Sequence, residues 1–122
     1  MSINKQNLTI VIVSFKSNHV IHDCINSIDK NIRIIVVDNS NDQQFVEKLE
    51  IKYKNVKCIL SSENLGMGAG NNLGIKNVNS DYVLILNPDV ILNKNTIEEL
   101  MIASKNLSDF AERGPNLIKT LT

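Results

Sequence analysis

The chain has 122 residues, of which 43% are apolar and 21% charged, and its 13 basic and 13 acidic side chains balance. This length suits a single domain with one core, and the balanced charge argues against a nucleic-acid groove, which normally shows a basic excess. The longest apolar runs, "LTIVIV" and "YVLIL", are far shorter than the roughly 20 residues that span a bilayer, and the polar start lacks the pattern of a signal peptide.

The predicted elements alternate between strand and helix along the chain. Near-continuous β-branched runs such as "LTIVIVSF" are typical of strands buried on both faces. Apolar residues spaced at i, i+3, i+4 and i+7 predict helices. In chain order we expect a strand over 8–15, a helix over 18–29, a strand over 32–38, a helix over 41–54, a strand over 56–60, a helix over 71–78, a strand over 81–86, a helix over 95–107 and the start of a fifth strand over 114–121. This alternation predicts an α/β fold, a Rossmann-like and mostly parallel sheet flanked by helices, and a single domain over 1–122.

The cysteines and histidines do not suggest a metal centre. Cys24 and Cys58 lie inside apolar patterns without a CxxC motif, so we expect two small buried side chains in a reducing cytoplasm. His19 and His22 are three residues apart on the first predicted helix, with only Asp23 close by as a further ligand. A solvated helix face is the favoured interpretation.

Polar residues follow each of the first four predicted strands. In open parallel sheets, ligands bind outside the carboxyl ends of the strands, so these positions are the candidates for a site. They are Ser14, Phe15 and Lys16 after the first strand, Asp38, Asn39 and Ser40 after the second, Asn64 and the glycines after the third, and Asn87, Pro88 and Asp89 after the fourth.

The segment "NLGMGAGNNLG", residues 64–74, holds four of the five glycines. A dinucleotide fingerprint requires G-x-G-x-x-G after the first strand, whereas the spacing here is G-x-G-x-G-x-x-x-G after the third. A P-loop requires G-K-[ST], but Asn71 follows Gly70. The glycines therefore indicate tight turns or close approach of the backbone, and a purely structural role stays open.

The sequence "NPDV" places one carboxylate, Asp89, just past a buried strand. Mg²⁺ often takes one or two protein carboxylates together with water and substrate phosphates, so a metal–nucleotide complex would suit this position. The alternative is a turn or cap that starts the next helix.

Four segments, "TIVIVSFK", "IIVVDNSND", "ENLGMGAGNNLGIK" and "DYVLILNPDVIL", together resemble the nucleotide-binding half of a family 2 glycosyltransferase with the GT-A fold. The resemblance extends from residue 8 to about 120, and the last two segments are most similar to the bacterial rhamnosyltransferase-type branch, which builds surface polysaccharide. It implies transfer of a sugar from a nucleotide diphosphate, dTDP or UDP, to a saccharide or lipid-linked acceptor, with inversion.

The resemblance also implies a nucleotide pocket. Val13, Ser14 and Phe15 would line the base, with Phe15 packed near it. Asp38 would accept a hydrogen bond from a pyrimidine, and Ser40 would lie close by.

The glycine segment and "NPDV" would complete this site. Asn64, Gly66 and Asn72 match the family loop that borders the nucleotide and the sugar. Asn87 and Asp89 occupy the positions of the family's D-x-D motif, where Asp89 would hold Mg²⁺ or Mn²⁺.

Three departures from the family pattern matter. Asn87 replaces the first acid of D-x-D, which weakens metal binding, and Asn71 stands where many members have an arginine. The acceptor-binding half, with its catalytic base, is not found before Thr122. We therefore expect a truncated enzyme or excised fragment that has no catalytic residue, binds a nucleotide at best and is inactive alone.

Further expectations concern assembly and location. A sheet edge or apolar face left uncovered would favour a homodimer. The resemblance implies a cytoplasmic protein, peripheral at the inner membrane face. Two other interpretations are a non-catalytic α/β module that binds partners, and a receiver-like domain, which would need acids after the first strand.

Overall fold

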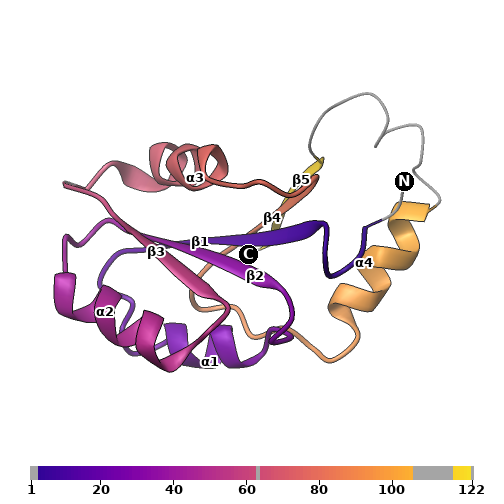
Figure 1. The fold of residues 1–122 in the computed structure, drawn as a ribbon, viewed down its shortest axis with the longest axis horizontal. Coiled ribbons are helices and arrows are strands. Elements are labelled where there is room, and N and C mark those ends of the chain that lie inside the picture. The colour runs from indigo at the N-terminus through magenta and orange to yellow at the C-terminus, as the bar shows by residue number, and fades with distance from the viewer. Residues whose placement is uncertain (1–2, 63, 106–116, 122) are drawn as a thin grey trace.

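The computed structural model describes residues 3–62, 64–105 and 117–121 (Figure 1). Strands and helices alternate along the chain as predicted. They are β1 (Leu8–Ser14), α1 (Ile21–Asn26), β2 (Arg33–Asp38), α2 (Gln43–Lys52), β3 (Val56–Leu60), α3 (Gly66–Lys76), β4 (Tyr82–Leu86), α4 (Thr96–Lys105) and β5 (Leu117–Leu121). The predicted α/β fold is confirmed. No helix in the described ranges is long and apolar enough to cross a membrane.

The five strands form one parallel sheet in the order β3-β2-β1-β4-β5. Strand β1 lies between β2 and β4, so the strand order changes direction at β1. The register pairs Ser14 with Asp38 and Ile12 with Leu86. The switch point therefore lies between β1 and β4, and the carboxyl ends of β1, β2 and β4 lie side by side at this edge, where open α/β sheets bind ligands.

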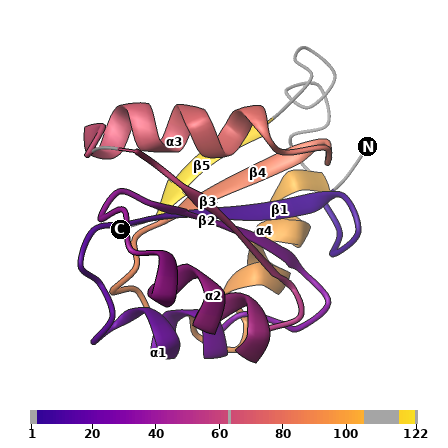
Figure 2. The ribbon, with the colours of Figure 1, turned by 60° about the vertical axis from the view of Figure 1, so that its left-hand side comes forward.

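Helices cover both faces of the sheet (Figure 2). On one face, α1, α2 and α4 pack over the larger core cluster, whose fully buried members include Ile10, Ile12 and Ile34. On the other face, α3 contributes Leu73 and Ile75 to a smaller cluster with β1, β2 and β4. Successive strand residues point to opposite faces, which explains why continuous apolar runs form these strands.

The helix predicted over 71–78 begins earlier, at Gly66, and includes three further glycines. Gly66 has a φ of 79° and its N–H donates to Oδ1 of Asn64 at 3.0 Å. A Cβ at Gly70 would lie 2.9 Å from Cγ1 of Val13, and one at Gly74 would lie 2.5 Å from Cγ1 of Val11. These two glycines therefore let α3 lie directly on β1, which is a structural role for half of the glycine segment.

The first helix is shorter than predicted, because it ends at Asn26. The Ser27 Oγ donates to the carbonyl of Cys24 at 2.6 Å and accepts the N–H of Leu92 at 3.0 Å, which ties the helix end to the segment after β4. His19 lies exposed before the helix, whereas His22 is half-buried with Nδ1 2.8 Å from the Tyr53 hydroxyl. The two histidines therefore do not share a helix face.

Strand β3 forms one edge of the sheet, and side chains and turns of the chain itself contact this edge. The N–H of Cys58 donates to Oε2 of Glu50 at 2.8 Å, from the neighbouring helix α2. The N–H of Val56 donates to the carbonyl of Tyr53 at 3.2 Å. These bonds use backbone donors that an edge strand would otherwise leave free.

Both cysteines are free thiols, with Cys24 fully buried and Cys58 half-buried. Burial, helped by Asp89 near Cys24 and by Glu50 and Asp38 near Cys58, raises the pKa of each thiol to about 12. We expect both to react with Ellman's reagent at neutral pH at least ~100-fold more slowly than in the urea-unfolded chain, because the thiolate is the reactive form. Equal rates in the folded and unfolded chains would contradict this burial.

Candidate nucleotide site

The end of β1 is linked directly to the end of β2. The N–H of Asn39 donates to the carbonyl of Ser14 at 2.8 Å, and the N–H of Lys16 donates to Oγ of Ser40 at 2.7 Å. Lys16 has a φ of 53°, and its Nζ lies 5.4 Å from the ring centroid of Phe15. This turn leaves the Phe15 ring 48% exposed, so an apolar surface is available just past β1.

The carboxylate of Asp38 is fully buried and organises the turn that leads into α2. Its Oδ1 accepts the N–H of Ser40 at 3.1 Å, and its Oδ2 accepts the N–H of Asp42 at 2.9 Å. Asp42 in turn accepts the N–H of Phe45 and caps α2. Asp38 and Ser40, both predicted as nucleotide contacts, are therefore engaged in holding this turn.

Asn39 directly follows β2 and lines a cavity at this edge of the sheet. It is among the strand-end candidates of the sequence but not among the predicted nucleotide contacts. The side chain is 97% buried, since its exposed fraction is 3%, and its Nδ2 donates to the carbonyl of Gly66 at 3.2 Å. Its Oδ1 has no hydrogen-bonding partner among the described residues, and the same holds for Oγ of Ser14. Buried polar atoms are nearly always paired, so this oxygen calls for a partner that the described residues do not supply, either an ordered water or a ligand.

A cavity of about 300 Å³ lies at this edge of the sheet. Its lining combines side chains of the switch point with the start of α3, and it is predominantly apolar. The lining residues are Val13, Phe15, Ser17, Asn39, Asn64, Gly66, Met67 and Pro88. A flat ring with a few polar edge groups suits such a lining.

Four of the predicted nucleotide contacts line this cavity, namely Val13, Phe15, Asn64 and Gly66. The other five do not. Ser14 and Asp38 are buried on the sheet, Ser40 holds the turn, Asn72 is exposed on α3, and Asn87 is half-buried after β4.

The "NPDV" segment directly follows β4, and its Pro88 lines the cavity. The carbonyl of Asn87 accepts the N–H of Val90 at 3.2 Å and the thiol of Cys24 at 3.6 Å, while the Asp89 side chain is exposed. Within the described ranges, no three His, Cys, Asp or Glu side chains gather as a metal site. Asp89 alone fits a cation that draws its other ligands from water and a diphosphate.

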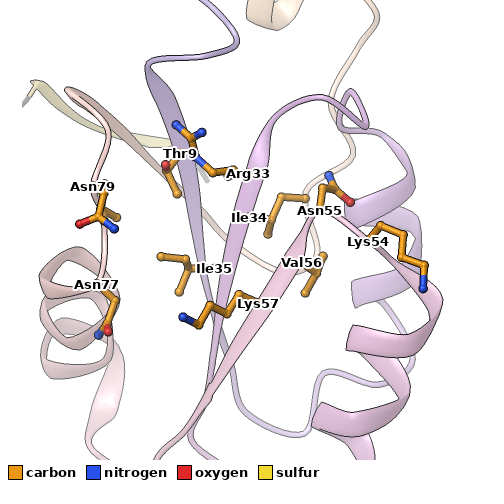
Figure 3. Close-up of a pocket in the computed structure, with 11 residues that line it drawn as sticks. Thr9, Arg33, Ile34, Ile35, Lys54, Asn55, Val56, Lys57, Asn77 and Asn79 are labelled. Atoms are coloured by element: carbon orange, nitrogen blue, oxygen red, sulfur yellow. The ribbon is translucent and has the colours of Figure 1, made fainter.

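A larger cavity, of about 460 Å³, lies at the opposite, amino-terminal edge of the sheet (Figure 3). It includes Thr9, Arg33 and Val56, which are at or near the starts of β1, β2 and β3. None of the predicted site residues lines it, and the switch-point rule does not apply to this edge.

A parallel sheet flanked by helices, with a cavity at its switch point, defines the class, an open α/β domain with a candidate ligand site at the carboxyl ends of its strands. The family follows from comparison with known proteins: the model of the family "Glycosyl transferase family 2" matches residues 9–107, so the chain belongs to that family. The predicted family is confirmed.

Individual relatives agree with this assignment. The chain is 35% identical over 97 residues to the low-salt glycan biosynthesis hexosyltransferase Agl10 of Haloferax volcanii, covering 76% of this chain and 31% of that protein. It is 41% identical over 70 residues to an uncharacterized glycosyltransferase of Rickettsia prowazekii, covering 57% of this chain and 21% of that protein. The crystal structure of S. aureus TarS 1–349 superposes with a TM-score of 0.63 at 26% identity, covering 88% of this chain and 32% of that one. The chain thus spans about a third or less of the length of these relatives.

Proposed function

We propose that this chain is the nucleotide-sugar-binding part of a glycosyltransferase that moves a sugar from a nucleotide diphosphate to a saccharide or lipid-linked acceptor in surface polysaccharide synthesis. The observation that carries the proposal is the cavity at the switch point, with the unpartnered Oδ1 of Asn39 beside it, in a chain of this family. The name of the Haloferax relative, a glycan biosynthesis hexosyltransferase, supports the general reaction.

In this proposal the base lies in the cavity against Phe15 and Met67, whose side chains are 48% and 49% exposed. The Oδ1 of Asn39 accepts a hydrogen bond from an N–H of the base, because the Nδ2 of the same side chain is already bound to Gly66. Asp38 and Ser40 act indirectly, since they fix the turn that presents Asn39. A pyrimidine nucleotide, dTDP or UDP, is the predicted donor carrier.

The diphosphate would then extend past Pro88 toward Asp89. Bound Mg²⁺ or Mn²⁺ would neutralise the leaving diphosphate, with Asp89 as its carboxylate ligand and Asn87 contributing at most an amide oxygen. A single protein carboxylate predicts weak metal binding in the absence of nucleotide.

In the same proposal the described residues bind the donor, and none of them is assigned the role of general base. A base must come within hydrogen-bond reach of the acceptor hydroxyl, and the carboxylate of Asp38 is buried and already bonded. We therefore expect the isolated chain to bind nucleotide without transferring sugar. A cytoplasmic location at the inner membrane face, the rhamnosyltransferase-type branch and a homodimer are further parts of the proposal; the exposed Ile91 and Ile102 offer apolar surface for the dimer.

The test is calorimetric titration of UDP, dTDP and GDP into the chain, with and without Mn²⁺. One nucleotide should bind saturably, and Asn39→Ala should weaken binding by about tenfold or more, since a buried hydrogen bond to a ligand is lost. Asp89→Ala should remove the stimulation by Mn²⁺ and leave metal-free binding unchanged.

The matched control is Asn26→Ala, which removes an exposed asparagine at the end of α1 and should leave binding unchanged. Absence of binding for all three nucleotides would contradict the proposal and favour a partner-binding module. Binding that survives Asn39→Ala would place the base elsewhere.

A further inference from the structure

The larger cavity at the amino-terminal edge of the sheet carries three cationic side chains and no acid. Arg33 is the first residue of β2, Lys54 lies two residues before the edge strand β3, and Lys57 is the second residue of β3. The whole chain has a formal net charge of zero, so this lining departs from the average surface. In the described part of the chain, none of the three forms an ion pair.

The sheet register places two of these cations on one face. Lys57 is the register partner of Ile35, and Arg33 precedes Ile35 by two residues. Side chains two apart on a strand, and those of paired residues, point to the same face, so Arg33 and Lys57 flank the buried Ile35. Figure 3 shows the Lys57 side chain extending from β3 toward the side of α3, whereas the ammonium group of Lys54 points away.

Neutral hydrogen-bonding groups complete the lining. Asn77 and Asn79 come from the segment after α3, and Asn55 is anchored through its Nδ2 to the carbonyl of Ile32 at 2.9 Å. The carbonyl groups at the end of α3 are largely bonded: that of Gly74 accepts the N–H of Asn77, and that of Leu73 accepts the Nδ2 of the same residue. The negative end of the helix dipole is therefore partly offset at the cavity.

The Arg33 guanidinium is oriented by its own chain. One nitrogen donates to the carbonyl of Gln6 at 2.6 Å, and its remaining N–H groups are available to a ligand. A guanidinium held by one hydrogen bond and a flexible ammonium are both groups that bind phosphate oxygens, the first by a forked pair of bonds and the second as a point charge. Figure 3 shows the Arg33 guanidinium and the Lys57 ammonium at opposite ends of the apolar floor.

We propose that this cavity is a second ligand site, which binds a phosphate-bearing group through Arg33 and Lys57. It is separate from the proposed donor site, because β1 runs from one edge to the other over its seven residues, a length of roughly 20 Å. The phosphate could belong to a soluble phosphate or diphosphate, or to a lipid headgroup. The chemistry at Arg33 and Lys57 is the same in both cases.

The test follows backbone amide NMR shifts of the whole chain during titration with inorganic pyrophosphate at constant ionic strength. Saturable shifts should gather at residues 33–35, 54–57 and 77–79, and Arg33→Gln/Lys57→Gln should weaken the apparent affinity by about tenfold or more. Both side chains are exposed, so the double variant keeps the fold, which the dispersion of its own spectrum reports. The control Lys48→Gln/Lys94→Gln removes the same charge from exposed positions outside the cavity and should leave affinity unchanged.

A parallel sedimentation assay with vesicles separates the two sources of phosphate. Binding to vesicles that contain phosphatidic acid but not to pure phosphatidylcholine, lost in the Arg33 and Lys57 variant, assigns the site to a headgroup. Binding to pyrophosphate alone assigns it to a soluble ligand. Absence of both, or equal binding by the double variant and its control, would overturn the proposal.

Discussion

Gly74→Ala should lower the free energy of unfolding by about 1–2 kcal/mol, although alanine is the better helix former by ~1 kcal/mol. The added Cβ would lie 2.5 Å from Cγ1 of Val11 and 3.2 Å from Cγ2 of Val37, and both valines are fully buried in the sheet. These side chains have no free space to move into, so α3 must shift away from β1. Urea unfolding followed by circular dichroism measures the effect.

Gly68→Ala is the matched control in the same helix. A Cβ at Gly68 meets nothing within 4 Å, and its φ is not positive, so the substitution should stabilise the chain by about 0.5–1 kcal/mol through helix propensity. If the free energy of unfolding rises for Gly68→Ala and falls for Gly74→Ala, the effect of close packing is separated from that of helix propensity. If both variants gained stability, α3 would not be seated on β1 in this way.

Asp38→Ala should be the more damaging change, with an expected loss of about 2–4 kcal/mol in the free energy of unfolding. It removes both acceptors for the N–H groups of Ser40 and Asp42 and leaves a small void at a fully buried position. The turn into α2 then lacks its organising group. Thermal and urea unfolding of the variant measure this loss.

The control for Asp38 is Asp23→Ala, an exposed acid on α1 whose loss should change stability by less than ~0.5 kcal/mol. The comparison with Asn39→Ala then separates two roles. Asp38→Ala should reduce both stability and nucleotide binding, whereas Asn39→Ala should reduce binding far more than stability. A stable Asp38→Ala variant that no longer binds nucleotide would instead restore Asp38 as a direct ligand.

Sequence patterns predicted the sheet well because its strands are buried on both faces. Short, nearly continuous β-branched runs such as "IRIIVVD" are typical of strands that are covered on both faces. The predicted strands agree with β1 to β5 within a few residues. The predicted start of α3, residue 71, was wrong, because the helix begins at Gly66. Glycines have low helix propensity, so the glycine segment was assigned to a loop. Contact with Val11 and Val13, which only the fold brings together with Gly70 and Gly74, decides the boundary.

The predicted site residues come from the edge of the sheet that holds the smaller cavity, but only some of them line that cavity. The strand-end rule led to Val13, Phe15, Asn64 and Gly66, which line the cavity. It could not choose between Asp38 and its neighbour Asn39, because that choice depends on which face each side chain points to at the end of β2. Alternation from the buried Val37, which packs beneath α3, would have indicated Asn39. No sequence pattern predicted the larger cavity with its three cationic side chains, because β2, β3 and the segment after α3 come together there only in the folded chain.

The carboxylate of Glu50 on the N–H of Cys58 has a consequence for how copies of this chain can meet. An intruding strand could add to β3 only by displacing that carboxylate, at the cost of a charge-assisted hydrogen bond. The sheet is therefore guarded against open-ended growth into fibrils from this side. Ordered pairing of two chains is therefore expected through side-chain surfaces or through another edge of the sheet. Mutation of Glu50 would free the N–H of Cys58 and make β3 more prone to pair with a strand of another chain.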